Sequence, residues 1–80
     1  MKNNKEVIVY STPDCAYCYT LKSYLQSKGI EYKEINIYEN ESARKTMEDI
    51  SGQKNVPVTV IDGQVVTGWD KKKINKLLNI

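Results

Sequence analysis

Hydrophobic residues along this chain form short clusters whose spacing changes from one cluster to the next. The continuous apolar run in Glu6–Tyr10 predicts a strand buried on both faces, typical of the centre of a sheet. From Cys15 to about Lys28 the spacing is helical, and the apolar face is formed by Cys18, Leu21 and Leu25, with Tyr17 and Tyr24 on its flank. Gly29 suits the left-handed residue that ends such a helix.

The next two clusters predict a second strand and a second helix. Glu31–Ile37 ends in an alternating apolar pattern and is expected to be a strand. Asn40 is a suitable N-cap for a helix that Gly52 closes. The apolar side of this helix is predicted to consist of Ala43, Met47 and Ile50.

The C-terminal part of the chain predicts a hairpin followed by a helix. The segments 58–61 and 64–67 flank Asp62-Gly63, one of the strongest short hairpin signals. Asp70 is a good cap for a last helix whose apolar side is Ile74, Leu77 and Leu78. With that cap, Trp69 and Ile74 occupy the two positions of a hydrophobic staple.

The order strand–helix–strand–helix–hairpin–helix predicts an α/β fold. Its first half is a right-handed parallel unit, and the hairpin adds two antiparallel strands, giving a mixed four-stranded sheet flanked by three helices. At 80 residues the chain forms a single domain, residues 1–80, and the polar segment 1–5 is expected to fray.

Composition and charge exclude several classes of function. The chain is 40% hydrophobic and 28% charged, which is typical of a globular protein. A net charge of +2 indicates neither a nucleic-acid nor a membrane partner. The longest early apolar run is too short for a signal peptide or a membrane span. We therefore expect a cytoplasmic monomer.

The two cysteines, Cys15 and Cys18, lie at the junction of the first strand and the first helix. A bridge between them closes such a small loop that it stabilises the fold by only about 2 kcal/mol. Structural zinc requires four nitrogen or sulfur ligands, and the chain has two cysteines and no histidine, so no metal site is expected. The pair therefore indicates thiol–disulfide chemistry rather than a staple.

The start of a helix favours Cys15 as a nucleophile, because unpaired backbone N–H groups and the helix dipole stabilise a thiolate there. We predict that Cys15 is partly or mostly thiolate at neutral pH, although the charge of the adjacent Asp14 opposes this. Cys18, one turn further along the buried side, is expected to be the resolving thiol that attacks a mixed disulfide on Cys15.

The chain resembles the glutaredoxins of the thioredoxin superfamily from Val7 to about Leu78. Four motifs carry this resemblance: Tyr10-Ser11-Thr12-Pro13-Asp14-Cys15-Ala16-Tyr17-Cys18, Asn55-Val56-Pro57, Ile61-Asp62-Gly63 and Gly68-Trp69-Asp70. It implies a thioredoxin-like fold and a cis Val56–Pro57 bond. It also implies an oxidoreductase with no bound cofactor that uses glutathione as reducing co-substrate and acts on disulfide-containing or glutathionylated proteins.

The same resemblance implies a glutathione-binding groove around the cysteines. Its residues are expected to be Tyr17, Val56, Pro57, Gly68, Trp69 and Asp70. Val56 would pair with the substrate through its backbone, and the Asp70 carboxylate would pair with the ammonium group of glutathione. Lys71, Lys72 and Lys73 are expected to be a solvated face that also steers anions.

Three departures from the usual glutaredoxin pattern leave alternatives open. Ala16 replaces a proline, Thr12 replaces a common lysine, and Thr67 replaces the first glycine of a Gly-Gly pair. Thr12 weakens the expected grip on the glycine carboxylate of glutathione. One alternative is a glutaredoxin-like redoxin reduced by thioredoxin reductase and donating electrons to ribonucleotide reductase. Another is a non-enzymatic thiol module, such as a metal-cluster carrier or redox sensor.

Overall fold

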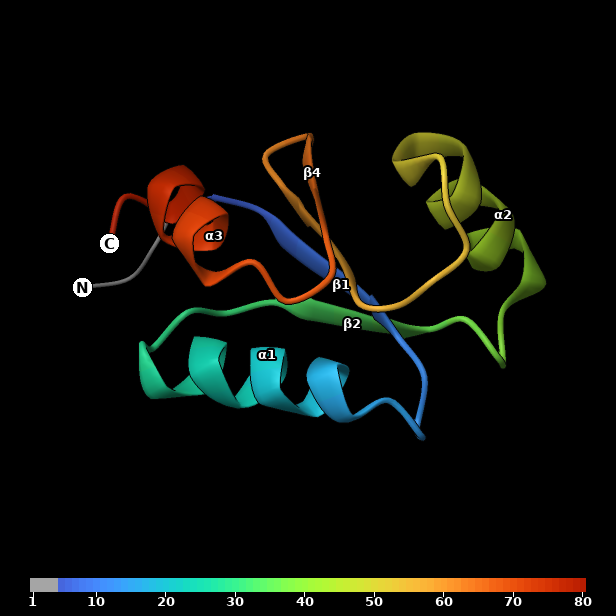
Figure 1. Ribbon diagram of the computed structural model, residues 1–80, viewed down its shortest axis with the longest axis horizontal. Coiled ribbons are helices and arrows are strands. Elements are labelled where there is room, and N and C mark those ends of the chain that lie inside the picture. The colour runs from blue at the N-terminus through green and yellow to red at the C-terminus, as the bar shows by residue number, and fades with distance from the viewer. Residues whose placement is uncertain (1–4) are drawn as a thin grey trace.

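The computed structural model describes residues 5–80, so the fraying expected for residues 1–5 lies, except at Lys5, outside the described residues (Figure 1). The elements follow the predicted order: β1 (Val7–Ser11), α1 (Ala16–Ser27), β2 (Lys33–Asn36), α2 (Glu41–Ser51), β3 (Val58–Ile61), β4 (Gln64–Thr67) and α3 (Lys71–Leu78). Across residues 5–80, no helix is both long and apolar enough to cross a membrane.

The sheet has the strand order β2-β1-β3-β4, which confirms the mixed four-stranded sheet. β1 pairs in parallel with β2, and β1–β3 and β3–β4 are antiparallel. β1 is therefore an interior strand, as its unbroken apolar run predicts. Because β1 and β2 are parallel, their carboxyl ends meet at one edge of the sheet, where Cys15 follows β1.

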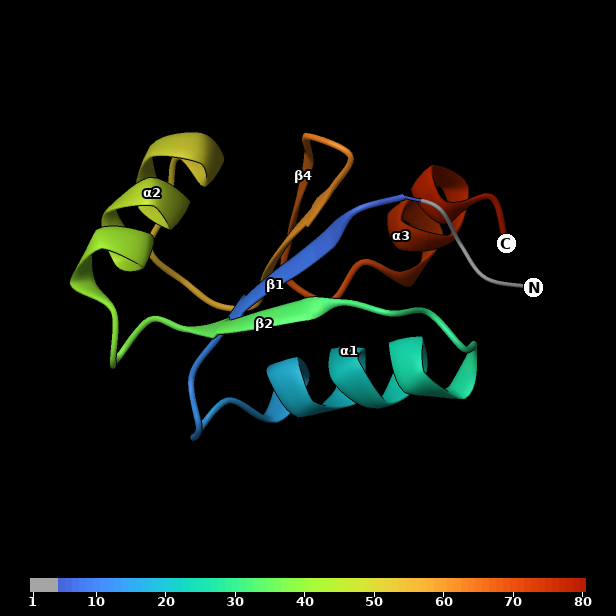
Figure 2. The same ribbon diagram turned by 180° about the vertical axis from the view of Figure 1, so that it is seen from behind.

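The helices divide into two layers, one on each face of the sheet (Figures 1 and 2). α1 and α3 cover one face over a cluster of buried residues: Val7, Val9, Leu21, Leu25, Ile30, Ile61, Val66, Ile74 and Leu78. α2 covers the other face over a smaller cluster: Tyr10, Ile37, Met47 and Val58. The alternation along β1 and β3 sends successive side chains to opposite layers.

Local sequence signals place the ends of the helices and the hairpin as predicted. The Asn40 side chain accepts a hydrogen bond from the Ala43 N–H at 3.0 Å. Gly52 ends α2 in the left-handed region with φ 70°. Asp62 and Gly63 have φ values of 49° and 84°, and two successive positive φ angles match the right-handed twist of a hairpin.

The second strand and one helix face differ from the prediction. β2 begins at Lys33 rather than Glu31, because pairing with β1 starts at Ile8 and an edge strand extends only as far as its partner supports it. Ile50 is 43% exposed, so Met47 alone is buried in α2. Periodicity identifies the apolar side of this helix but not how far the sheet covers it.

Candidate redox site

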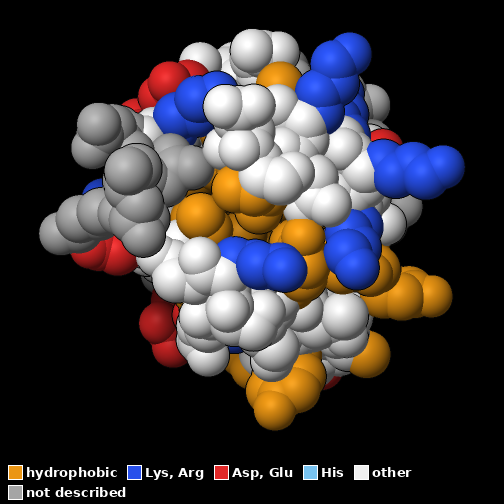
Figure 3. Space-filling model, turned by 90° about the vertical axis from the view of Figure 1, so that its left-hand side faces the viewer, with side chains coloured by type: hydrophobic (Ala, Val, Ile, Leu, Met, Phe, Trp, Pro, Cys, Tyr) orange, Lys and Arg blue, Asp and Glu red, His pale blue; other side chains and the backbone are white. Residues whose placement is uncertain are grey.

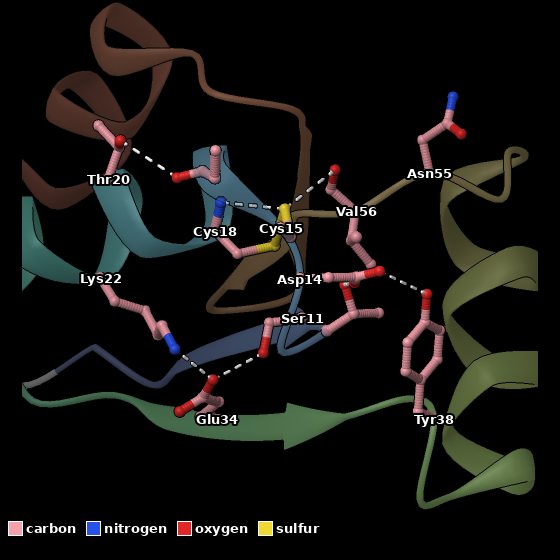
Figure 4. Close-up of a disulfide and its surroundings, with 12 residues drawn as sticks. Ser11, Asp14, Cys15, Cys18, Thr20, Lys22, Glu34, Tyr38, Asn55 and Val56 are labelled. Atoms are coloured by element: carbon pink, nitrogen blue, oxygen red, sulfur yellow. Dashed lines mark hydrogen bonds and ion pairs between the residues drawn. A yellow bond between two sulfur atoms is a disulfide. The ribbon is translucent and has the colours of Figure 1, made fainter.

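Cys15 is the N-cap of α1 and forms a disulfide with Cys18 (Figure 4). Its Sγ accepts a hydrogen bond from the backbone N–H of Cys18 at 3.1 Å. Cys18 is fully buried on the face of α1 that packs on the sheet, whereas Cys15 is partly exposed. An incoming disulfide therefore meets Cys15 first, and the helix N-terminus presents an N–H group to its sulfur.

The loop before β3 also approaches Cys15, from a part of the chain far from α1. The carbonyl oxygen of Val56 lies 3.8 Å from the Cys15 Sγ. The Val56–Pro57 bond is cis, as the resemblance implied. The N–H of Gly68 donates to the carbonyl oxygen of Pro57 at 2.8 Å, so the 67–70 loop is joined to the same place. The Val56-Pro57 segment thus lies beside Cys15, and the 67–70 loop is joined to that segment through Gly68.

An open groove of about 430 Å³ leads from solvent to Cys15. Its volume falls within the range of small-molecule sites, roughly 300–1,000 Å³. The residues that line it come from the loops after β1 and β2 and from the segment before Pro57: Thr12, Asp14, Cys15, Ile37, Tyr38, Lys54, Asn55 and Val56. The groove therefore fits a small thiol compound or an extended stretch of polypeptide.

Asp14 supplies a fixed negative charge to this groove. Its carboxylate accepts a hydrogen bond from the hydroxyl of Thr12 at 2.8 Å and one from the hydroxyl of Tyr38 at 3.3 Å (Figure 4). The hydrogen bond from Thr12, and to a lesser extent that from Tyr38, holds the pKa of Asp14 below its usual value of 3.8. The carboxylate is therefore ionised at neutral pH and lies next to Cys15 in the groove.

The 67–70 loop packs its tryptophan inward. The Trp69 ring meets Tyr24 of α1 edge to face, with centroids 5.4 Å apart, and packs against the cluster that contains Ile74, as a staple requires. The Asp70 carboxylate caps α3 by accepting from the Lys73 N–H at 3.2 Å. Neither Trp69 nor Asp70 lines the groove at Cys15.

Asp70 instead borders a second hollow beside the α3 lysines, together with Gln64, Lys72, Lys73, Lys76 and Leu77. On the side of the molecule where α3 and the chain ends lie, basic side chains surround an apolar patch (Figure 3). The first turn of α3 holds basic residues and no acidic one, which is the less favourable sign at a helix N-terminus. The exposed basic face expected from Lys71, Lys72 and Lys73 is therefore present.

The residues expected to bind glutathione therefore occupy three places. Val56 lines the groove, whereas Pro57 and Gly68 do not line it and are joined to each other by a backbone hydrogen bond. Trp69 and Asp70 lie on the side of α3, away from the groove lining. Tyr17 is 63% exposed on α1, so it does not flank the core and is free to contact a ligand.

Tyr38, Lys54 and Asn55 line the groove and were not singled out from the sequence as binding residues. A signal for Tyr38 was present, because it follows the end of a strand predicted to run parallel to the strand before Cys15. In open α/β sheets, ligands bind beyond the carboxyl ends of such strands. Lys54 and Asn55 directly precede the Val56-Pro57 motif, so their position in the chain was also informative.

The chain matches the family model described as Glutaredoxin over residues 7–66. It is 40% identical over 70 residues to an uncharacterised glutaredoxin-like 8.6 kDa protein in the rubredoxin operon of Clostridium pasteurianum, covering 88% of this chain and 93% of that protein. It is 38% identical over 64 residues to glutaredoxin 3 of Escherichia coli K12, covering 80% and 77% of the two chains.

The crystal structure of a mutant of the thioredoxin-like protein BC3987 superposes with a TM-score of 0.89 at 33% sequence identity. The superposition covers 94% of this chain and 96% of that one. This likeness includes the strand order and the three helices described above, so the fold is thioredoxin-like. With the family match over most of its length, the chain belongs to the glutaredoxin family and is a thiol redox protein with a Cys-x-x-Cys centre.

Proposed function

We propose that this protein is a glutathione-dependent thiol–disulfide oxidoreductase that reduces protein disulfides and glutathione mixed disulfides. The position of Cys15 carries this proposal: it is the cap of α1, it faces an open groove, and its sulfur accepts the Cys18 N–H. The buried Cys18 behind it supplies a second thiol that a bulky substrate does not reach directly. We assign the activity to the cytoplasm, where reducing conditions return such a cysteine pair to the dithiol after each turnover.

In the first step, the thiolate of Cys15 attacks one sulfur of the substrate disulfide. A sulfur–sulfur bond forms to Cys15, the substrate bond breaks, and one substrate thiol leaves with a proton. The Cys18 thiolate then attacks the Cys15 sulfur and releases the second substrate thiol. The substrate gains two electrons, and the protein is left with the Cys15–Cys18 disulfide.

Two molecules of glutathione complete the cycle. The first attacks the Cys15–Cys18 disulfide and forms a mixed disulfide on Cys15, and the second attacks that mixed disulfide and leaves as oxidised glutathione. The Val56 backbone is adjacent to the Cys15 sulfur, which suits strand-like pairing with a tripeptide. Trp69, through its backbone, and Asp70 are the proposed contacts for the γ-glutamyl end, and Tyr17 is a rim contact.

One observation favours a second candidate, a redoxin reduced by thioredoxin reductase. Thr12 stands where many glutaredoxins have a lysine, and it is 7% exposed and donates to Asp14. The groove therefore has a carboxylate next to the position where a cation would hold the glycine carboxylate of glutathione. A flavoprotein reductase that docks by surface contact does not need that cation.

The deciding experiment supplies 2-hydroxyethyl disulfide and compares two sources of electrons. One reaction contains glutathione, glutathione reductase and NADPH, and the other contains thioredoxin reductase and NADPH. We expect sustained NADPH oxidation with glutathione. Turnover only in the reaction that contains thioredoxin reductase would replace the proposal with the second candidate. Turnover in neither reaction would reject both.

Cysteine variants test the roles of the two thiols. Cys15→Ser is expected to abolish activity on every substrate, because it removes the nucleophile. Cys18→Ser is expected to lose the reduction of protein disulfides but to keep the reduction of glutathione mixed disulfides, since glutathione itself then resolves the intermediate. Both activities are measured in the glutathione-coupled assay, with a protein disulfide or a glutathionylated peptide in place of 2-hydroxyethyl disulfide. Activity retained in Cys15→Ser would show that the nucleophile is misassigned.

A further inference from the structure

We propose that Asp14 determines the specificity of the redox groove: its carboxylate favours small disulfides with a cationic group beside the reacting sulfurs over those with a carboxylate there. The inference rests on the proposed function, because it names which disulfides Cys15 attacks most rapidly. It goes further in assigning a role to a residue outside the Cys-x-x-Cys pair. Asp14 takes no part in the thiol–disulfide exchange. Its carboxylate attracts or repels the charged groups of the disulfide that approaches Cys15.

The position of this charge is fixed from two directions. Thr12, in the loop after β1, holds one oxygen of Asp14, and Tyr38, in the turn after β2, donates to the other. Figure 4 shows the carboxylate and the Tyr38 hydroxyl facing each other on the side of Cys15 where Val56 lies. A carboxylate bound by two donors is an oriented charge in the groove rather than a freely rotating surface group.

The other charged residues near this carboxylate do not neutralise it. Lys54 lines the same groove, but within residues 5–80 its exposed side chain forms no hydrogen bond or ion pair, and a long solvated lysine spreads its charge over many positions. Beyond Tyr38, Arg44 lies 3.8 Å from Glu41 and 3.8 Å from Glu48, so its charge is already shared with two acids.

Three symmetric disulfides of similar size probe this charge: cystamine, which carries two ammonium groups, 3,3′-dithiodipropionate, which carries two carboxylates, and neutral 2-hydroxyethyl disulfide. In each case Cys15 attacks either equivalent sulfur and one small thiol leaves. Cys18 then displaces the second, so the protein loses two electrons and the disulfide becomes two thiols. No further reductant enters the measurement.

The rate constant for oxidation of the reduced protein by each compound is measured by acid quenching and mass spectrometry. The quantity of interest is the ratio of the cystamine rate constant to the dithiodipropionate rate constant. We expect this ratio to fall about fivefold in Asp14→Asn, which corresponds to roughly 1 kcal/mol in total. About half comes from the lost attraction of the ammonium group and half from the lost repulsion of the carboxylate, as for unit charges roughly 8 Å apart in water. Differences in intrinsic reactivity, and any change in the Cys15 pKa, cancel when this ratio is compared between variants.

Two further variants separate local charge from other effects. Asp14→Lys reverses the charge, and we expect its ratio to fall below that of Asp14→Asn. Asp62→Asn makes the same change in net charge at the β3–β4 turn, at the opposite end of β3 from the groove, and keeps an oxygen to accept from the Glu6 N–H. We expect its ratio to stay within about twofold of the unmodified protein, since exposed charges more than about 10 Å apart are screened.

The outcomes distinguish the inference from the function on which it rests. An unchanged ratio in Asp14→Asn, or an equal fall in Asp62→Asn, overturns the specificity role while leaving the oxidoreductase proposal intact. A reduced protein that none of the three disulfides oxidises overturns both.

Discussion

The two faces of the sheet differ in how much they bury and in what they place near the groove. The α1/α3 face holds nine buried residues in one cluster among residues 5–80, and the α2 face holds four. The cysteine pair belongs to α1 and is anchored on the larger cluster. Two walls of the groove, 37–38 and 54–56, precede and follow α2. The cysteine pair is therefore positioned by the more extensively buried face, and two walls of the groove are positioned by the segments beside the other face.

Because of this difference, the positions of the two cysteines and of the groove walls depend on different helices. The positions of Cys15 and Cys18 depend on how α1 packs. The position of Tyr38 depends on a helix that is held to the sheet by one fully buried side chain, Met47. Small shifts of α2 therefore change the shape of the groove more than they change the cysteine pair.

Truncating one buried side chain on each face tests this comparison most strongly. We expect Leu25→Ala to lower the free energy of unfolding by about 3 kcal/mol and Met47→Ala by about 2 kcal/mol. Both side chains are fully buried, but methionine is flexible and its neighbours on α2 are largely exposed. For 80 residues, total stability is roughly 4–12 kcal/mol, so both changes are measurable by urea unfolding.

Native-state amide exchange gives the sharper readout for the same two variants. Met47→Ala is expected to accelerate exchange mainly in α2, whereas Leu25→Ala is expected to accelerate it across β1 and α1 together. Equal acceleration in both layers for Met47→Ala would mean that α2 is not held separately.

The α1/α3 face contains a buried hydroxyl that has no partner among residues 5–80. Thr59 in β3 is 0% exposed, and its Oγ1 makes no hydrogen bond to any described residue. It lies opposite Val9 and Val66, both members of the larger cluster. Thr59→Val keeps the shape and removes the unpaired group, so we expect the free energy of unfolding to rise by about 1 kcal/mol. A loss of stability in urea unfolding would show that the hydroxyl has a role.

The smallest effect is expected at the edge of this face, where Lys22 of α1 pairs with Glu34 of β2 at 2.6 Å. This hydrogen-bonded pair, with a second hydrogen bond from Ser11, lowers the pKa of Glu34 from its ordinary 4.5. The ionised Glu34 therefore contributes its full stabilisation of the fold above pH 4.5, and this contribution is lost as the pH falls through the lowered pKa. Because the Glu34 side chain is 40% exposed, solvent screening limits its contribution.

Glu34→Gln should consequently cost about 0.5 kcal/mol near neutral pH and nothing in strong acid. Urea unfolding at both pH values measures the difference, with Glu39→Gln as a control of equal charge change. A constant cost at both pH values would assign the effect to side-chain packing instead of charge.

The sequence identified the elements and the reactive pair because their signals are local. The cap at Asn40, the turn at Asp62-Gly63 and the helix start at Cys15 each depend on a few neighbouring residues. The start of β2 was less well predicted, because it depends on where Ile8 of another strand begins to pair. Ile50 was misplaced for a similar reason, since its exposure depends on the extent of the sheet and not on helical spacing.

The groove was predicted only in part, because its walls meet through tertiary structure. Tyr38 and Asp14 are far apart in the chain and come together because β1 and β2 are parallel and in register. No local pattern shows that a tyrosine hydroxyl and a threonine hydroxyl will share one carboxylate. The sequence shows that Asp14 adjoins Cys15, but it does not show that Thr12 and Tyr38 both donate to its carboxylate.

The contact between Trp69 and Tyr24 gives the molecule an internal optical reporter. Trp69 is the only tryptophan in the sequence, and its ring lies against the helix that carries Cys18, just before the start of α3. Indole emission depends strongly on its immediate surroundings, so a shift of α1 against α3 changes the fluorescence of the unlabelled protein. The docking of these two helices is thus observable in real time, without introducing a dye or a further thiol.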